Sequence, residues 1–209
     1  ARGREVIEAL LPGFTQALID RGALLGDLGE DIEFQVDGQC LAKQHVGHHG
    51  IAVSRLAIED ELRRRVLALP GVRVMTGVDV IEPVHASGRS GSMRERLSLS
   101  QPAGRIVGVR WAPRGSDDLD MLPADLVVDC TGRGSRMPLW LRRWGMRPAR
   151  EDRVRVGLVY LSATFERDAA IAPVPTAAIV SATPNHPRTG VLIAQEPDAQ
   201  GRGRWVAGV

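Results

Sequence analysis

The stretch that decides the fold is ADLVVDCTGRGSRMPLWLRRWG, residues 124–145. Its apolar run at residues 126–128 predicts a short strand that is buried on both faces of an α/β sheet. Gly132 and Gly134 follow, and glycine allows both unusual backbone conformations and the close approach of a ligand to the main chain. A helix is expected over residues 137–144, with free N–H groups at its start that point back at the turn. This order of strand, glycine-rich turn and helix predicts a nucleotide-binding site.

The expected helix has start and stop signals at both ends. Ser135 is a good N-cap, Pro138 is tolerated in the first turn, and Gly145 favours termination. As a dinucleotide fingerprint the spacing is incomplete, because Met137 stands where the third glycine is expected and no acidic residue follows at the usual distance. A plain strand-to-helix connection is therefore the alternative interpretation.

The segment ADLVVDCTGRGS, residues 124–135, resembles the second flavin motif of FAD-dependent monooxygenases of the aromatic-hydroxylase type. In that family an apolar strand after Ala-Asp leads into a short Asp-Gly turn and a Ser. Thr131 stands where those hydroxylases usually have Asp, and the sequence DCTG is more similar to flavin-dependent halogenases, epoxidases and isoprenoid reductases. The resemblance implies that the turn lies against the ribose and pyrophosphate of FAD. The implied cofactor contacts in it are Asp129, Thr131, Gly132, Gly134 and Ser135.

A second segment, VSRLAIE at residues 53–59, is similar to the Ser-Arg-x-x-Leu-Glu helix start of the same family. Ser54 is a plausible N-cap, and Arg55 falls in the first turn, where a guanidinium can join the helix amides around an anion. The resemblance implies that Arg55 binds the FAD phosphates. The alternative is a surface arginine without a role.

The helix that begins at Arg55 is predicted to be amphipathic. Its apolar positions are Ile58, Leu62, Val66 and Leu69. Acidic residues 59–61 each precede one of the arginines at 63–65 by four positions, which predicts a solvated face with ion pairs rather than a nucleic-acid-binding surface.

The remaining pattern predicts further helices, a meander and a second strand-rich region. Helical patterns cover residues 4–11 and 14–20, and expected strands of the meander cover residues 72–75, 78–81 and 105–111. Polar loops are expected at residues 87–104 and 113–120. The strand-rich region is expected at residues 153–160, 177–180, 190–194 and 204–207. The aromatic side chains Tyr160, Phe165 and Trp205 are predicted to pack in a core, and the alternative is that they face the substrate pocket that the resemblance implies.

The fold class expected from these elements is α/β. The resemblance implies that residues 1–150 are part of an FAD-binding, Rossmann-like domain with a β-meander. Residues 151–209 would then begin a mostly antiparallel, substrate-binding sheet domain. The family's Gly-x-Gly-x-x-Gly unit and its later Gly-Asp turn are not found, so the chain is expected to be an internal fragment.

Composition excludes several other classes of protein. A net charge of +2 over 209 residues, with acids and bases interspersed, gives no case for a nucleic-acid partner. Cys40 and Cys130 have no metal or redox spacing and indicate reduced thiols in a cytoplasmic protein, and no apolar run is long enough to span a membrane. The histidines at 45, 48 and 49 are interpreted as part of a polar loop rather than a metal site.

The leading hypothesis from the resemblance is an FAD-dependent oxidoreductase, specifically a monooxygenase. NAD(P)H would reduce the flavin, dioxygen would form a flavin C4a-hydroperoxide, and an apolar or aromatic organic substrate would be hydroxylated or epoxidised. No catalytic acid or base is named, since the cofactor is the reagent. The alternatives are an isoprenoid reductase, a halogenase, for which the single lysine Lys43 has no supporting context, and a truncated remnant that does not bind FAD.

Overall fold

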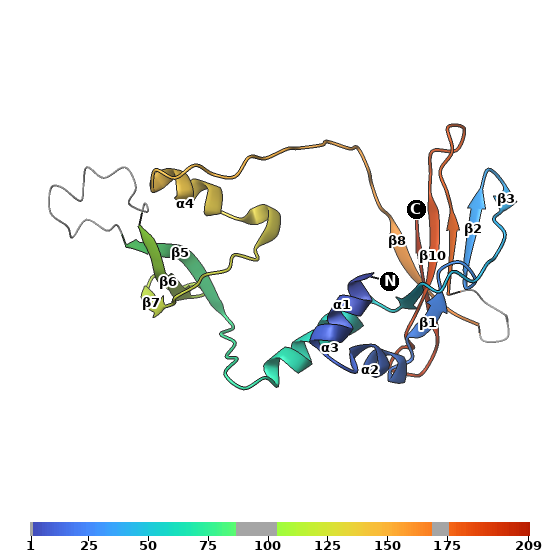
Figure 1. Cartoon of the computed structure of the whole chain (residues 1–209), viewed down its shortest axis with the longest axis horizontal. Coiled ribbons are helices and arrows are strands. Elements are labelled where there is room, and N and C mark those ends of the chain that lie inside the picture. The colour runs from blue at the N-terminus through green and yellow to red at the C-terminus, as the bar shows by residue number, and fades with distance from the viewer. Residues whose placement is uncertain (1, 87–103, 169–175) are drawn as a thin grey trace. The chain divides into compact units, whose positions relative to one another are not determined.

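A computed structural model describes residues 2–86, 104–168 and 176–209 (Figure 1). The chain forms two compact units. The first unit comprises residues 1–73 and 157–209, and the second comprises residues 74–156. Each unit is described by itself below, and the expected assignment of residues 1–150 and 151–209 to cofactor and substrate domains stays a prediction.

The helices of the first unit enclose its small apolar core. They are α1 (Arg2–Leu10), α2 (Phe14–Asp20) and α3 (Arg55–Leu67). Phe14 and Leu18 of α2 are almost fully buried and pack with Ala23 and Ala57. Partly buried side chains from α1, α3 and the neighbouring strand surround this cluster: Ile7, Leu11, Ile51, Val53, Ile58 and Leu62. The helices predicted at residues 4–11 and 14–20 and from Arg55 onward are therefore confirmed.

The first unit also contains two sheets. β1 (Leu24–Asp27) and β4 (His49–Ala52) form an antiparallel pair. The larger sheet has the order β3-β2-β9-β10-β11-β8. Its strands are β2 (Ile32–Val36), β3 (Gln39–Cys40), β8 (Ser162–Glu166), β9 (Ala177–Val180), β10 (Gly190–Gln195) and β11 (Arg204–Gly208). Only the β2–β9 pair among them is parallel.

The second unit is built on an antiparallel meander, in which the predicted strands at 78–81 and 105–111 are present and the third strand was not predicted. β5 (Val78–Ala86), β6 (Arg105–Pro113) and β7 (Asp120–Pro123) pair in the order β5-β6-β7. A single 3-10 turn at Gly132–Gly134 and the helix α4 (Met137–Arg143) follow the meander. The polar stretch at 113–120 connects β6 to β7, whereas most of the predicted loop at 87–104 lies outside the described residues.

Both units together combine helices with antiparallel and mixed sheets, which agrees with the α/β class at its coarsest level. The predicted strand at residues 126–128 is wrong. Leu126 is 79% exposed and Val128 is 71% exposed, and neither belongs to a strand. A doubly buried strand needs paired neighbours, and in the described part of this unit the sheet pairing ends where the Ala124 N–H donates to the Val107 carbonyl.

Two other predicted strands are also absent from the described structure. Residues 72–75 and 153–160 have no strand conformation, and most of their apolar side chains are exposed. An apolar run alone does not determine a strand, because the backbone also needs a neighbouring strand with which to form hydrogen bonds. After residues 153–160 the chain re-enters the larger sheet at Ser162, where β8 pairs with β11.

The charged face of α3 is mostly exposed, as predicted, but its residue Glu61 is buried. Glu61 is 2% exposed and accepts hydrogen bonds from Arg64 and from Arg65. Arg65 also donates to the carbonyl oxygens of Pro12 and Gly13, at 2.7 and 2.8 Å. Glu61 and Arg65 therefore form a clamp, buried at Glu61, that fastens α3 to the connection between α1 and α2.

Among the residues that the structure describes, no helix is both long and apolar enough to cross a membrane.

Candidate functional site

The first part of the candidate site is the N-terminus of α3. Ser54 caps this helix, as predicted, because its hydroxyl oxygen accepts a hydrogen bond from the Ala57 N–H at 3.1 Å. Ser54 is itself buried. The capping geometry is therefore set inside the protein rather than at its surface.

Ser54 is held from the other side by Glu196, which directly follows β10. The Glu196 carboxylate accepts hydrogen bonds from the Ser54 N–H at 2.7 Å and from the Ser54 hydroxyl at 2.6 Å. Arg204 on β11 donates to the same carboxylate at 2.8 Å and to the Glu196 carbonyl at 3.1 Å. Burial acts to raise the pKa of Glu196, but the bonds from Ser54 and the charge of Arg204 outweigh it, so the pKa lies below its ordinary value.

Arg55 is the first residue of α3 and is almost fully exposed. Its guanidinium donates to Glu59 at 2.6 Å, and the hydrogen bond and charge of Glu59 raise the pKa of Arg55. This ion pair is weak because water screens both side chains, so an anion that binds here can replace Glu59.

A cavity of about 530 Å³ lies beside Ser54 and Arg55. Its lining combines the start of α3 with residues of β8, β10 and β11 and with the residue that follows each of α2 and β10. The lining residues are Arg21, Ser54, Arg55, Leu56, Ala57, Asp60, Thr164, Gln195, Glu196 and Arg204. The first turn of a 13-residue helix lines this space together with an exposed arginine, and both favour an anionic ligand.

The second part of the candidate site is the turn at residues 129–135. The Asp129 carboxylate accepts hydrogen bonds from the N–H and hydroxyl of Thr131, at 2.9 and 2.6 Å, and from the hydroxyl of Ser135 at 2.6 Å. The bond from Ser135 and then those from Thr131 lower the pKa of Asp129. The carboxylate is therefore ionised and organises the turn.

The glycines of this turn leave its backbone accessible. Gly132 has a φ of 66°, in the left-handed region that favours glycine. A Cβ placed on Gly132 or on Gly134 would meet no atom within 4 Å, so nothing in the described part of the chain covers these positions. A ligand could therefore approach the main chain directly.

The role predicted for Ser135 is partly wrong. The N-cap of α4 is Arg136, which makes no capping hydrogen bond, and Ser135 lies one residue earlier. The Ser135 hydroxyl still accepts a hydrogen bond from the Met137 N–H at 3.1 Å, and it donates to Asp129. Ser135 therefore links the turn to the helix without being the cap.

The predicted cofactor residues fall into two groups. Hydrogen bonds join Asp129, Thr131 and Ser135 in the second unit. Arg55 belongs to the first unit. Sequence analysis missed Glu196, whose link to Ser54 spans 142 residues.

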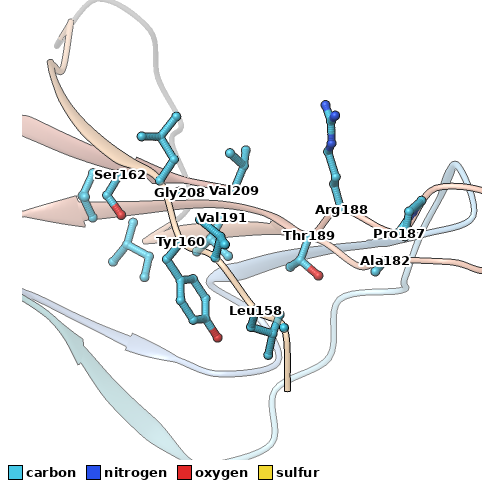
Figure 2. A pocket seen from close by; sticks show the side chains of 15 residues that line it. Leu158, Tyr160, Ser162, Ala182, Pro187, Arg188, Thr189, Val191, Gly208 and Val209 are labelled. Atoms are coloured by element: carbon cyan, nitrogen blue, oxygen red, sulfur yellow. The ribbon is translucent and has the colours of Figure 1, made fainter. Parts of the chain in front are cut away.

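A third feature is an apolar cavity of about 800 Å³ in the first unit (Figure 2). It is lined mainly by residues 157–162 and by apolar side chains of β10 and β11, including Val191, Ile193 and Val206. Tyr160 lines this cavity and is exposed, and Phe165 is exposed as well, so the prediction that both pack in a core is wrong. In Figure 2 the Arg188 side chain extends away from Tyr160, which leaves the tyrosine side of the cavity apolar.

The histidines at 45, 48 and 49 do not lie on a helix. His49 begins β4, whereas His45 lies before it and contacts the carboxylates of Asp27 and Glu30. Within the described ranges, no group of histidine, cysteine, aspartate and glutamate side chains is placed to hold a metal ion. Cys40 and Cys130 are both free and exposed.

Comparison with known proteins gives one relevant similarity. No protein-family model matches the chain. The chain is 32% identical over 173 residues to Protein Rv3254 of Mycobacterium tuberculosis, a match that covers 79% of this chain and 33% of that protein. The chain therefore spans about a third of the length of this relative.

Proposed function

We propose that this chain is part of an FAD-dependent monooxygenase that oxygenates an apolar or aromatic substrate with electrons from NAD(P)H. The observation that carries the proposal is the N-terminus of α3, where Arg55 faces a cavity of about 530 Å³ beside a buried serine cap. A helix N-terminus and a guanidinium together suit a diphosphate, because both supply N–H donors and positive charge.

The glycine turn supports the same proposal. Its backbone is open at Gly132 and Gly134, and its donors are ordered by the Asp129 carboxylate. These residues fit the ribose and pyrophosphate of FAD in chemistry, since hydroxyls, N–H groups and an uncovered main chain can all contact such groups. In this proposal Arg55 binds phosphate, and Asp129, Thr131, Gly132, Gly134 and Ser135 position the ribose and pyrophosphate. A Rossmann-like FAD-binding domain is part of the proposal.

When bound, reduced FAD supplies the redox chemistry and the activation of dioxygen. This chain supplies binding, orientation and exclusion of water. The apolar cavity beside Tyr160 supports an apolar or aromatic substrate, because its lining offers few polar partners to a charged molecule. No side chain of the chain is assigned as a catalytic acid or base.

The phosphate role of Arg55 is tested by FAD titration of the complete protein, followed by quenching of flavin fluorescence. Arg55→Ala is expected to weaken FAD binding by about tenfold, because a charge-assisted contact to phosphate is lost. Arg63→Ala is the matched control, since Arg63 is exposed on the same helix and makes no hydrogen bond or ion pair among the described residues. Equal affinity of the two variants would refute the assignment.

The reaction class is tested by product analysis with NADPH, dioxygen and apolar test substrates. An oxygenated product would support the monooxygenase. A product with a reduced carbon–carbon double bond would instead establish the isoprenoid-reductase alternative, and a halogenated product formed with added halide would establish the halogenase.

A further inference from the structure

We infer that Glu196 is a positioning residue for the anion site at Arg55, which it controls through the Ser54 cap. This inference rests on the proposed function, because it takes the diphosphate of FAD to be the anion. Among the described residues, no hydrogen bond or ion pair joins Glu196 to Arg55. Its effect passes through the backbone at the start of α3.

The geometry fixes both polar groups of Ser54 at once. One carboxylate oxygen of Glu196 accepts from the Ser54 N–H, and the other accepts from the Ser54 hydroxyl. Because the hydroxyl hydrogen is committed to Glu196, its oxygen lone pairs are left to accept from the Ala57 N–H. Glu196 therefore selects the orientation of Ser54 in which the helix is capped.

The position of Arg55 depends on this junction. Arg55 directly follows Ser54, and its recorded side-chain bond is to Glu59 within the same helix. In the described part of the chain, no hydrogen bond or ion pair ties the Arg55 side chain to another element. The backbone at Ser54, which Glu196 holds in place, therefore sets the direction in which the Arg55 side chain points toward the cavity.

Arg204 completes the arrangement by balancing charge. A carboxylate near a diphosphate site would repel the ligand if it were unpaired. Arg204 donates to the Glu196 carboxylate and carbonyl and lines the same cavity, so it compensates the negative charge where the anion would bind. With Arg204 as its partner, Glu196 can hold Ser54 in place without repelling the anionic ligand.

Two explanations of Glu196 predict opposite effects for Glu196→Gln. If the residue acted only through its charge, removal of a negative charge would strengthen the binding of an anion. If Glu196 positions the cap, glutamine is a poor replacement, because its side chain has only one acceptor oxygen for the two Ser54 donors and its NH₂ group cannot accept a hydrogen bond. FAD binding then weakens. The sign of the change in FAD affinity separates them.

The test is a double-mutant cycle on the complete protein, with FAD binding measured by fluorescence quenching. Glu196→Gln is expected to weaken FAD binding about fivefold or more when Arg55 is present and to have little further effect in an Arg55→Ala background. Glu166→Gln is the matched control, because Glu166 is an exposed carboxylate of β8 in the same sheet. Tighter or unchanged binding of Glu196→Gln would overturn the inference, as would an equal loss in both backgrounds.

A second pair of variants keeps the test independent of any loss of folding by Glu196→Gln. Ser54→Thr keeps the hydroxyl and is expected to retain FAD affinity, whereas Ser54→Ala is expected to lose about as much as Glu196→Gln. Equal affinity of the two Ser54 variants would contradict the inference. Absence of FAD binding by the unmodified protein is a different result, because it would remove the proposed function itself.

Discussion

The start of α3 and the turn at residues 129–135 are both predicted to contact FAD, but they are built in different ways. Ser54 is buried and is held by Glu196, 142 residues further along the chain. The turn is mostly exposed, and Asp129 bonds to partners no more than six residues away. One site is assembled by tertiary structure, and the other is ordered by its own sequence.

This difference explains why sequence analysis found Ser54 and Asp129 but missed Glu196, the distant partner of Ser54. The cap at Ser54 requires the surrounding sheet to present Glu196, so it is expected to fail when that packing fails. The turn at Asp129 needs only local hydrogen bonds and is expected to persist. Substitutions in the two regions should therefore differ in their effects on the whole protein.

The largest effect is expected from Glu61→Ala, which removes the buried clamp of α3. Glu61 is 2% exposed and pairs with Arg64 and Arg65. Its loss should lower the free energy of unfolding of the first unit by roughly 2–3 kcal/mol, because the arginines lose a buried, charged partner. Urea unfolding followed by circular dichroism measures this change. Glu59→Ala, an exposed carboxylate on the same helix, is the control and should change it little.

The same clamp is expected to make the first unit sensitive to acid. Hydrogen bonds from Arg64 first, and then the bonds from Arg65 and the charges of both arginines, outweigh burial and lower the pKa of Glu61 from 4.5 to about 2. Since the folded pKa lies below the unfolded one, the stabilisation is complete above the unfolded value and is lost as the pH falls from about 4.5 toward about 2. Unfolding free energies measured across this range should converge for the native protein and Glu61→Gln. A constant difference between them would contradict this account.

A smaller effect is expected from Ser54→Ala. The variant loses the cap of α3 and leaves the buried carboxylate of Glu196 with fewer donors. The free energy of unfolding should fall by about 1–2 kcal/mol. Amide hydrogen exchange should be faster at the first turn of α3 than in the native protein, and unchanged protection there would show that the cap is not important.

The smallest effect is expected from Thr131→Ala in the exposed turn. The variant loses one hydroxyl hydrogen bond to Asp129, while the bonds from the residue 131 N–H and from Ser135 remain. The unfolding midpoint should stay close to that of the native protein, because the change is at an exposed position. FAD affinity should nevertheless fall. A large loss of stability would show that this turn, like the cap, depends on tertiary packing.

Local signals were sufficient for several elements. The Ser54 cap located the start of α3, and the alternating pattern located β6. The predicted apolar face of α3 is only partly right, because Ile58 and Leu62 pack against the core whereas Val66 and Leu69 are exposed. The helix α4 was found because proline at its start and glycine after its end are direct signals.

Elements that depend on distant partners could not be predicted in the same way. β2 pairs in parallel with β9, and such a pairing leaves no signal within a short window of sequence. The exposed residues 126–128 show the reverse error, since their apolar run is present but their strand partners are not found among the described residues. The burial of Glu61 was missed because charges spaced four apart look alike on an exposed and on a buried helix face.

The most direct test of the central claim is the flavin content of the complete purified protein. Its absorbance spectrum, recorded after incubation with FAD and removal of the free cofactor, should show stoichiometric bound flavin, and the Arg55→Ala variant should retain less. A native protein that emerges colourless and takes up no FAD would contradict the claim that the α3 N-terminus and the turn at Asp129 serve a flavin site.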